Sequence, residues 1–596
     1  MPTSAEQFRR SRAPRRPAAV ALVLVSALFS SATALGAEPV SPQAASAILA
    51  IIRSTASSSE ATIPEAPELD RPDPPMLLAT IYHRGPTTFH VAVSAQTLRA
   101  AAQEVGRNLG QHLARLPEGS RLLQEGRLQF DLVLERIPIN PRHRVLALQG
   151  LKPGCEGLAC HWEEQSLYFS PLEVLSNLHE ADPVRTLFIS RTSSIPPRRI
   201  AFERIATASF VEERPGGDAV PVVRGNVLET DRHASDLIAA CCQAGLWLLR
   251  MQQEDGSFLP TYFPGEDRTD ETEAAPLADQ MRAVLALTVM HRLTGDERFL
   301  RARDRAIAFA RNSLKTNERV SASWLGQGQK DDITATATLL TALCTHELAQ
   351  ATPTADNLMR SLGEYLCILT DEEGRLYTSL ARALDDHPTR VVQGQPYADV
   401  LMALCLLEQT SPNQRVRRAI ERLVGQMTSF RSSAPPAGPR TIEALAEAYK
   451  VTPGKRLGDI VYELGGLLTQ TQITPDKADL PDAVGGFAEP GMIPQTDATA
   501  MATTALAVAY QMGWVVGKDP ERFRQPVERA AGFLLNMQFR EANSFYLSRH
   551  EVILGGFRKR ADDLTLELGP GAEAIRALIA AATVLSETPA TTPPAQ

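Results

Sequence analysis

Apolar residues recur at helical spacing through the second half of the chain, in twelve successive stretches separated by polar connections. The helices that this pattern predicts lie near residues 235–253, 277–293, 297–314, 333–349, 355–370, 397–409, 413–428, 440–450, 456–471, 498–514, 520–540 and 570–587. Short turns follow the even members, whereas long connections such as 254–276 and 472–497 follow most odd members. This alternation predicts six antiparallel hairpins whose long connections share one face.

Two sequence repeats support the pairing into hairpins. The end of the first expected helix, Trp247-Leu-Leu-Arg-Met-Gln252, returns as Phe533-Leu-Leu-Asn-Met-Gln538 and more loosely as Leu467-Leu-Thr-Gln470. The segments Pro276-Leu-Ala-Asp279 and Pro396-Tyr-Ala-Asp399 each begin an even helix and lie 120 residues apart. Proline in the first turn with aspartate just inside is typical of a helix start, and a fixed period indicates a repeat architecture.

We therefore expect a mainly α protein in which residues 226–590 form a closed (α/α)6 toroid. The even helices, which are richer in Ala and Leu, should form its inner ring. The pattern resembles the six-hairpin glycosidase-like superfamily and, in outline, the terpenoid-cyclase toroids. The segment Gln252–Phe258 is similar to the Gln/Trp repeat of those cyclases, with Phe258 in place of Trp, whereas their Asp-x-Asp-Asp acid motif is absent. The glycosidase-like resemblance implies a cavity at the long-loop face and the chemistry of sugar hydrolases, lyases or epimerases.

Strand patterns dominate the region before the toroid. Alternating or β-rich runs and two helical stretches predict a smaller α+β domain over residues 76–225. The strands are expected at 77–83, 88–94, 127–137, 145–149, 165–169, 186–190 and 202–211, and the helices at 96–116 and 171–178. Its histidines are scattered, so we expect an accessory or substrate-presenting module.

The first 75 residues carry export and linker signals. Five arginines between positions 9 and 16 precede an apolar run at 18–29 and a small-residue stretch ending at Ala37. This order predicts a cleaved secretory signal over residues 1–37, a periplasmic or secreted protein, and no stable membrane anchor afterwards. Residues 38–75, rich in Ser and Pro, are expected to be a flexible linker with a short helix near 41–54, and residues 591–596 a disordered tail.

Charge and motif content narrow the function classes. A net charge of −8 argues against a nucleic-acid partner. The sequence contains no phosphate-binding loop, dinucleotide fingerprint or zinc-spaced Cys/His cluster, so we expect neither cofactor nor metal. Cys155 and Cys160 stand in a Gly-bearing segment and are a candidate pair in an oxidising compartment.

Glycan chemistry generally needs two carboxyl groups beside the scissile bond. Aspartates at the starts of even helices lie on the loop face, and the catalytic candidates are Asp279, Asp332, Asp399 and Asp497. Helix capping is the alternative role, and it is favoured for Asp332 and Asp497. Asp279 and Asp399 lie further inside their helices and should face the toroid mouth, with Asp332 between them on one arc and one acid carrying a raised pKa.

Aromatic platforms and planar polar groups on the same face are the substrate-binding candidates, with loop packing as the alternative. They are Tyr262, Gln280, Arg282, Trp324, Tyr377, Tyr397, Phe487, Gln495, Phe557 and Arg558. We expect an exported carbohydrate-active enzyme acting on a poly- or oligosaccharide by carboxylate acid/base chemistry. A non-catalytic glycan- or protein-binding scaffold in envelope biogenesis is the alternative, and a terpene-type cyclase is a third.

Overall fold

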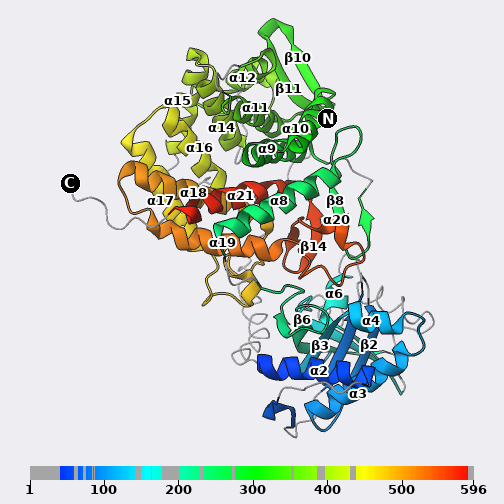
Figure 1. The fold of residues 1–596 in the computed structure, drawn as a ribbon. Coiled ribbons are helices and arrows are strands. Elements are labelled where there is room, and N and C mark those ends of the chain that lie inside the picture. The colour runs from blue at the N-terminus through cyan, green and yellow to red at the C-terminus, as the bar shows by residue number, and fades with distance from the viewer. Residues whose placement is uncertain are drawn as a thin grey trace, which may run out of the picture.

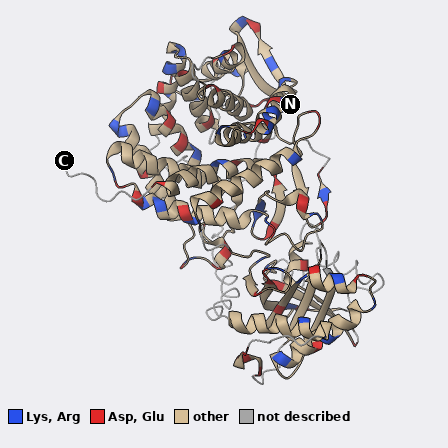
Figure 2. Ribbon diagram, in the orientation of Figure 1, with Lys and Arg blue, Asp and Glu red and all other residues tan. Residues whose placement is uncertain are grey.

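A computed structural model describes two bodies, an α+β domain and a larger helical ring (Figure 1). The described residues are 40–58, 65–70, 76–83, 85, 87–140, 150–162, 164–176, 200–228, 232–270, 275–328, 330–350, 355–384, 396–429 and 438–587. The expected secretory signal, the C-terminal tail and the strands expected at 145–149 and 186–190 lie outside these residues. Positively and negatively charged residues are intermixed along the ribbon of both bodies (Figure 2).

The α+β domain is built on an antiparallel sheet of seven strands, in the order β2-β1-β3-β6-β4-β5 with β7 also paired to β6. The strands are β1 (Met76–Tyr82), β2 (Thr87–Ser94), β3 (Arg127–Pro138), β4 (Glu156–Trp162), β5 (Gln165–Phe169), β6 (Ala201–Glu212) and β7 (Ala219–Val222). The helices are α2 (Pro42–Ser57), α3 (Leu98–Leu113), α4 (Gly119–Glu125) and α6 (Pro171–Ser176), with a 3-10 turn, η1, at Pro67–Asp70. Strand alternation and helix periodicity therefore predicted five of these strands and three of the helices, α2, α3 and α6, although α2 was expected within a linker.

Helix α2 corrects the expected boundary of the linker. Its apolar residues, among them Ile48 and Ile52, are fully buried in the core that α2 shares with α3 and one face of the sheet. Gly106 of α3 lets the two helices approach closely, because a Cβ there would lie 2.6 Å from the side chain of Thr55. The apolar stripe of α2 needs this partner, so residues 42–57 belong to the α+β domain and not to a flexible linker.

The positions of Cys155 and Cys160 beside and within strand β4 contradict the candidate disulfide. Cys155 lies in the turn just before β4 and Cys160 lies within the strand, and neither forms a disulfide. The strand from Glu156 to Cys160 alone spans about 13 Å, whereas a disulfide needs Cα atoms within about 7 Å. The two cysteines therefore cannot pair in this fold.

Twelve helices form the ring in the part of the chain that the structure describes, and the predicted (α/α)6 toroid is confirmed. They are α8 (Ala234–Met251), α9 (Leu277–Thr294), α10 (Glu297–Arg311), α11 (Ile333–Glu347), α12 (Asn357–Leu369), α14 (Pro396–Thr410), α15 (Gln414–Ser429), α16 (Pro439–Val451), α17 (Lys455–Leu468), α18 (Thr496–Val516), α19 (Arg524–Met537) and α21 (Leu568–Ser586). The even members pack in the closed sequence α9-α11-α14-α16-α18-α21-α9, and the odd members lie outside them.

Short elements occupy the long connections on the loop face. They are β8 (Thr261–Phe263), β9 (Arg268–Thr269), β10 (Leu314–Asn317), η4 (Glu318–Val320), β11 (Ala322–Gln327), β12 (Lys330–Asp331), α13 (Leu380–Leu384), η5 (Thr469–Thr471), η6 (Pro481–Ala483), α20 (His550–Ile553), β13 (Arg558–Arg560) and β14 (Asp563–Glu567). A further 3-10 turn, η7 (Glu521–Phe523), lies in the short turn between α18 and α19. Strands β13, β14, β8 and β9 form one small sheet, which joins two connections that are far apart in the sequence.

A glutamine after each of three outer helices, α8, α17 and α19, ties that helix to the next outer helix. Gln252 Nε2 donates to the carbonyl of Ala302 in α10 at 2.7 Å. Gln472 Nε2 and Gln538 Nε2 make the same bond, at 2.8 Å to Pro526 in α19 and at 2.9 Å to Ala240 in α8. Gln252 and Gln538 end the two close copies of the sequence repeat, whereas Gln472 lies two residues after Gln470 of the looser copy. The repeat therefore encodes the contact between hairpins at two of these three junctions.

The glycine turns after these glutamines follow from the same packing. Gly485 and Gly555 have φ of 90° and 86°, and a Cβ on either would lie within 2.1 Å of a backbone carbonyl in the next outer helix. The phenylalanines that follow, Phe487 and Phe557, are buried in the toroid core. These matched turns are repeat geometry.

One ring helix is long and apolar enough to span a membrane by length and composition. This is α21, with a mean hydropathy of 1.4 over its most apolar window, and 67% of that window is buried inside the protein. Because α21 packs against α8, α9 and α18, its apolar surface is used in the ring core.

The α+β domain docks on the long-loop face. Arg224, at the end of the domain, forms a two-bonded ion pair of 2.6 and 2.8 Å with Asp482 in the connection before α18, and both side chains are buried. The Arg224 carbonyl accepts a hydrogen bond from Arg558 Nη1 at 2.9 Å, and the Arg558 carbonyl accepts from Thr496 Oγ1 at 2.6 Å. Nearby, the ring of Tyr82 packs edge-on against Phe545.

Candidate functional site

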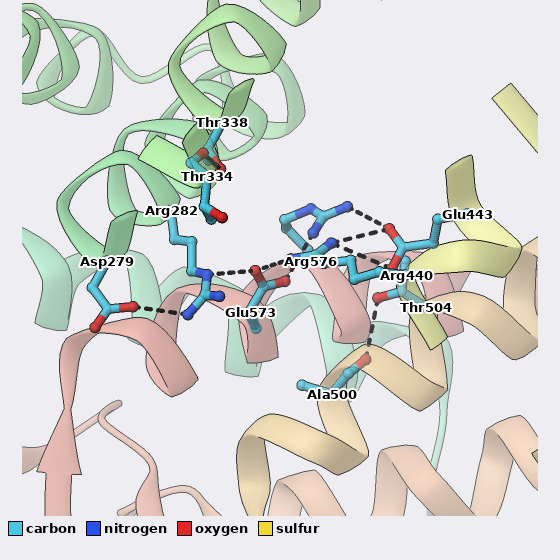
Figure 3. A network of polar contacts seen from close by, with 10 residues as sticks. All are labelled: Asp279, Arg282, Thr334, Thr338, Arg440, Glu443, Ala500, Thr504, Glu573 and Arg576. Atoms are coloured by element: carbon cyan, nitrogen blue, oxygen red, sulfur yellow. Dashed lines mark hydrogen bonds and ion pairs between the residues drawn. The ribbon is translucent and has the colours of Figure 1, made fainter. Parts of the chain in front are cut away.

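A cluster of charged side chains lies inside the ring, where the inner helices begin (Figure 3). Arg440 Nη1 on α16 lies 3.2 Å from Glu443 Oε2, and Arg440 Nη2 also binds Glu573 on α21. Arg576 donates to both carboxylates, at 2.8 Å to Glu573 Oε2 and 2.8 Å to Glu443 Oε2. Arg282 Nε on α9 lies 3.6 Å from Glu573 Oε1. Ion pairs thus join three inner helices across the ring.

Glu573 is the centre of this network. Its burial opposes ionisation, but the positive charges of Arg440, Arg576 and Arg282 outweigh that effect and lower its pKa to about 2. The Glu573 carboxylate is therefore ionised throughout the physiological range. It cannot donate a proton, and its role is to hold the three guanidinium groups together.

Three aspartates approach the same cluster from α9, α14 and α18. Burial raises the pKa of Asp399 to about 6, against the opposing charges of Arg440 and Arg282. Burial and then the charge of Glu573 raise the pKa of Asp497. Burial also raises the pKa of Asp279, although its Oδ1 accepts a 2.8 Å bond from Arg282 Nη1.

Asp399 and Asp497 each keep one carboxylate oxygen buried and without a hydrogen-bond partner among the described residues. Asp497 does not cap its helix in the structure: α18 has Gln495 as its N-cap residue, with no side-chain cap bond. These two groups therefore have the unmet hydrogen-bonding capacity that marks a site for a ligand or a reacting proton.

Asp332 does not join the cluster. Its Oδ1 accepts the backbone N–H of Ala335 at 2.9 Å and caps the start of α11. The expected arc of Asp279, Asp332 and Asp399 is thus corrected. In ring order α9, α14 and α18 are alternate inner helices, so Asp279, Asp399 and Asp497 are spread around the ring.

The sequence contained a signal for this arrangement. Pro494-Gln-Thr-Asp497 is a third copy of the Pro-x-x-Asp segment found at Asp279 and Asp399. The missed residues Glu443 and Glu573 each have an arginine three positions away on the same inner helix, Arg440 on α16 and Arg576 on α21. Glu573 and Arg576 are the only charged residues of the apolar helix α21, so this pair indicates the ring interior. Helix α16 also carries the partly exposed pair Glu447–Lys450 at the same spacing, so spacing alone does not identify Arg440–Glu443.

Two of the ten substrate-binding candidates instead hold the loops to the inner helices. Gln280 Oε1 accepts the backbone N–H of Phe258 at 3.0 Å, and the Tyr397 hydroxyl accepts that of Leu376 at 3.1 Å. Thr336 and Thr499 make the matching bonds to the connections before α11 and α18, at 3.0 and 3.1 Å. Gln280 is 2% exposed, so the structure corrects its expected ligand role.

The aromatic candidates are mostly packed. Tyr262 donates from its hydroxyl to Asp267 at 2.6 Å. Trp324 stacks on Tyr365 and donates to Asp331 at 2.7 Å. The remaining buried candidates are Tyr377, Phe487, Phe557 and Arg558. The expected row of sugar platforms is therefore replaced by loop and core packing, because these rings close the gaps between hairpins.

Two polar candidates remain near the mouth. Gln495 is exposed at the N-cap position of α18 and pairs through its backbone with Arg560. Arg282 lies in the charge cluster and binds Asp279. Gly569 makes room for that pair, because a Cβ there would lie 2.4 Å from Asp279 Oδ1.

No family model matches the chain, and no curated protein matches it. Solved structures that match include a cellobiose 2-epimerase from Bacillus thermoamylovorans B4167, at 12% identity, 58% of this chain, 98% of that chain and a TM-score of 0.44. An alpha-1,6-mannanase from Salegentibacter sp. HEL1_6 matches at 9% identity, 59% of this chain, 100% of that chain and a TM-score of 0.43. A D-mannose isomerase matches at 11% identity, 58% of this chain, 97% of that chain and a TM-score of 0.42.

Proposed function

We propose that the toroid is a carbohydrate-active enzyme that uses carboxylate acid/base chemistry on a poly- or oligosaccharide at the centre of the ring. The observation that carries this proposal is the pair Asp399 and Asp497. Each has a buried carboxylate oxygen without a hydrogen-bond partner among the described residues, beside an arginine–carboxylate network.

The roles follow from the different environments of the carboxyl groups. A general acid works best with a pKa near the working pH, and the pKa of Asp399 is raised to about 6. Asp399 is therefore assigned as the proton donor to the substrate, which in hydrolysis or elimination is the donor to the leaving oxygen. Asp497, at the start of another inner helix, is assigned as the second carboxyl group, which receives a proton or steadies the developing positive charge.

Two other acids have supporting roles. Glu573 stays ionised and fixes the three arginines, whose charges keep the ring interior polar. Asp279 binds Arg282 and so helps to hold that guanidinium toward Glu573. Hydrolysis, elimination and epimerisation all need such a pair of acid and base, and the reaction type is an outcome of the test below.

Export is part of the proposal. The order of basic, apolar and small residues over positions 1–37 supports cleavage near Ala37 and a periplasmic or secreted enzyme. N-terminal sequencing of the mature protein checks this directly. A soluble cytoplasmic protein that retains residues 1–36 would contradict it.

The decisive experiment is a turnover screen of neutral, amino- and uronic-acid oligosaccharides with the wild type and single variants. Asp399→Asn and Asp497→Asn should each lower turnover by roughly 10²–10⁴-fold, because the amide keeps the shape but transfers no proton. Asp332→Asn is the matched control, because asparagine also caps helices and turnover should be unchanged. Binding without turnover in the wild type would instead support the non-catalytic scaffold.

A further inference from the structure

The α+β domain ends in a tight turn that packs against the long-loop face of the ring. Val223 and Asn226 pair through two backbone hydrogen bonds, of 3.0 and 2.8 Å, so Arg224 and Gly225 form a two-residue turn between them. Both turn residues have positive φ, 49° and 75°, as a type I′ turn requires. A Cβ on Gly225 would lie 2.6 Å from the hydroxyl oxygen of Tyr546, so the turn touches the connection that precedes α21.

Arginine is an unusual residue at this place in a turn. Positive φ suits Gly, Asn and Asp, and other residues adopt it at a cost in free energy. Arg224 adopts it with a buried side chain that donates to both carboxylate oxygens of Asp482, at 2.6 and 2.8 Å. Residues held in such a conformation by buried contacts cluster at functional sites. The turn alone does not account for Arg224, so its role lies in what its contacts hold.

The side chain of Arg224 is linked to the first turn of α18 through Asp482. Asp482 lies in η6, and a tight turn at Gly485, with φ of 90°, leads from there to Phe487. The backbone N–H of Phe487 donates to Thr499 Oγ1 on α18 at 3.1 Å. Asp482 and Thr499 are both fully buried, so this route from the domain to the helix runs through the protein interior.

The carbonyl of Arg224 is linked to the same helix turn by a second route. It accepts a hydrogen bond from Arg558 Nη1 at 2.9 Å, and the Arg558 carbonyl accepts one from Thr496 Oγ1 at 2.6 Å. Arg558 and Thr496 are also fully buried. The two routes therefore end at Thr496 and Thr499, which lie on either side of Asp497 in the sequence.

From these contacts we infer that the α+β domain holds the first turn of α18 in place, and that Arg224 is a positioning residue for the carboxyl group of Asp497. The link to turnover rests on the proposed function, in which Asp497 is the second carboxyl group. A displacement of about 1 Å in a reacting group can lower a rate by roughly 10²-fold, so an anchor outside the ring can set the rate inside it. The domain is thus a fixed part of the site and not a separate module that presents substrate.

The first test is hydrogen exchange followed by mass spectrometry on the full chain. Arg224→Asn introduces a residue that suits the turn but removes the bonds to Asp482. Peptides that contain Phe487 and Thr499 should exchange at least ~10-fold faster in this variant, because the connection and the first turn of α18 lose their anchor. If Arg224 were only a turn residue, asparagine would leave this exchange unchanged.

Two controls separate positioning from a general loss of stability. The start of α11 has the same kind of bond, from the N–H of Leu325 to Thr336 Oγ1 at 3.0 Å, but α11 lies opposite α18 in the ring. Exchange at Leu325 should not change in Arg224→Asn. Ser321→Asn makes the same substitution at an exposed residue with φ of 51°, and exchange at α18 should stay as in the wild type. Equal acceleration at α11 and α18, or none at α18, would overturn the inference.

The second test measures steady-state kinetics with a glycan identified by the turnover screen. Arg224→Asn should lower kcat by roughly 10–100-fold, because the reacting carboxyl group is displaced, while KM stays within about 3-fold of the wild type. Arg224→Lys keeps a positive charge beside Asp482 and should restore part of the lost kcat. An unchanged kcat in Arg224→Asn, with turnover that depends on Asp399, would refute the inference and leave the proposed function intact. Faster exchange at α18 in a protein that turns over no glycan would support the domain's hold on this helix and refute the proposed function instead.

Discussion

Asp279 Oδ1 lies against Gly569, so closely that a Cβ at position 569 would be 2.4 Å from it. The same Oδ1 accepts a 2.8 Å bond from Arg282 Nη1. The first turn of α21 therefore leaves room for the Asp279–Arg282 pair on α9. Because Gly569 has no side chain, both charged groups can take these positions.

Gly569→Ala should push Asp279 away from Arg282 and destabilise the protein by about 1–3 kcal/mol, because the added methyl group overpacks this contact. Thermal and denaturant unfolding measure the change. Gly425→Ala is the matched control, since Gly425 is exposed in α15 and a Cβ there meets nothing within 4 Å. That control should gain about 0.5–1 kcal/mol from its higher helix propensity. Equal effects of the two substitutions would argue against the close packing of α21 on Asp279.

Removing the charge from Glu573 and from Asp399 should change stability in opposite directions. Glu573→Gln leaves three clustered arginines without their shared carboxylate and should cost about 3–5 kcal/mol. Asp399→Asn replaces an acid whose pKa is raised mainly by burial, so the free energy of unfolding should be unchanged or higher near pH 7. Chemical denaturation of both variants beside the wild type decides this, and a larger loss for Asp399→Asn would contradict the network.

The raised pKa of Asp399 also predicts how the stability of the folded protein changes with pH. Because the folded state holds this proton more tightly than the unfolded state, its stabilising effect is complete below about pH 4 and is lost as the pH rises through about 6. The melting temperature of Asp399→Asn should therefore rise relative to the wild type between pH 4 and 7. Asp296 provides a control of opposite sign, since bonds from Arg298 lower its pKa and Asp296→Asn should lose relative stability as the pH rises. Parallel pH profiles for both variants would refute this account.

The junction between the domains depends on Arg224 and Asp482. Arg224→Met leaves a fully buried Asp482 unpaired and should cost about 3–5 kcal/mol. The double variant Arg224→Met/Asp482→Asn should be less destabilised than the sum of the two single changes, and a double-mutant cycle of unfolding free energies measures the difference. Arg268→Met is the control: Arg268 pairs with Glu266 while its side chain is 53% exposed, so its loss should cost less than about 1 kcal/mol. Additivity of the two junction substitutions would rule out the coupling.

The ring was predictable because its signals are local and repeated. Helical spacing located twelve helices, the alternation of turn lengths paired them into hairpins, and Ala and Leu content assigned the inner ones. The glutamine at the end of α8, Gln252, was visible as a repeat, but its bond to Ala302 depends on the position of the neighbouring helix. Helix α2 was placed in the linker because its partner α3 begins about 40 residues later, so the local sequence does not show what its apolar stripe packs against.

The sequence predicted only part of the site, because the type of a residue does not show whether its side chain is buried in the folded protein. Asp399 and Asp332 both stand at helix starts, yet one enters the charge cluster and the other caps a helix. Trp324 has the flat aromatic side chain on which a sugar ring could stack, but it stacks on Tyr365 of an outer helix instead. Such differences arise because segments that are distant in the sequence pack together. The spacing of apolar residues along the chain does not predict that packing.

The bond from Gln538 to the Ala240 carbonyl joins the sixth hairpin to the first. It repeats the link found between other neighbouring hairpins, and α21 packs beside α8 at the seam. The packing of the toroid consequently does not distinguish a first hairpin from a last one. Only the order of the chain makes α8 the first helix. A circular permutant that joins the end of α21 to the start of α8 and opens a short turn, such as that after Thr294, would keep each of these links.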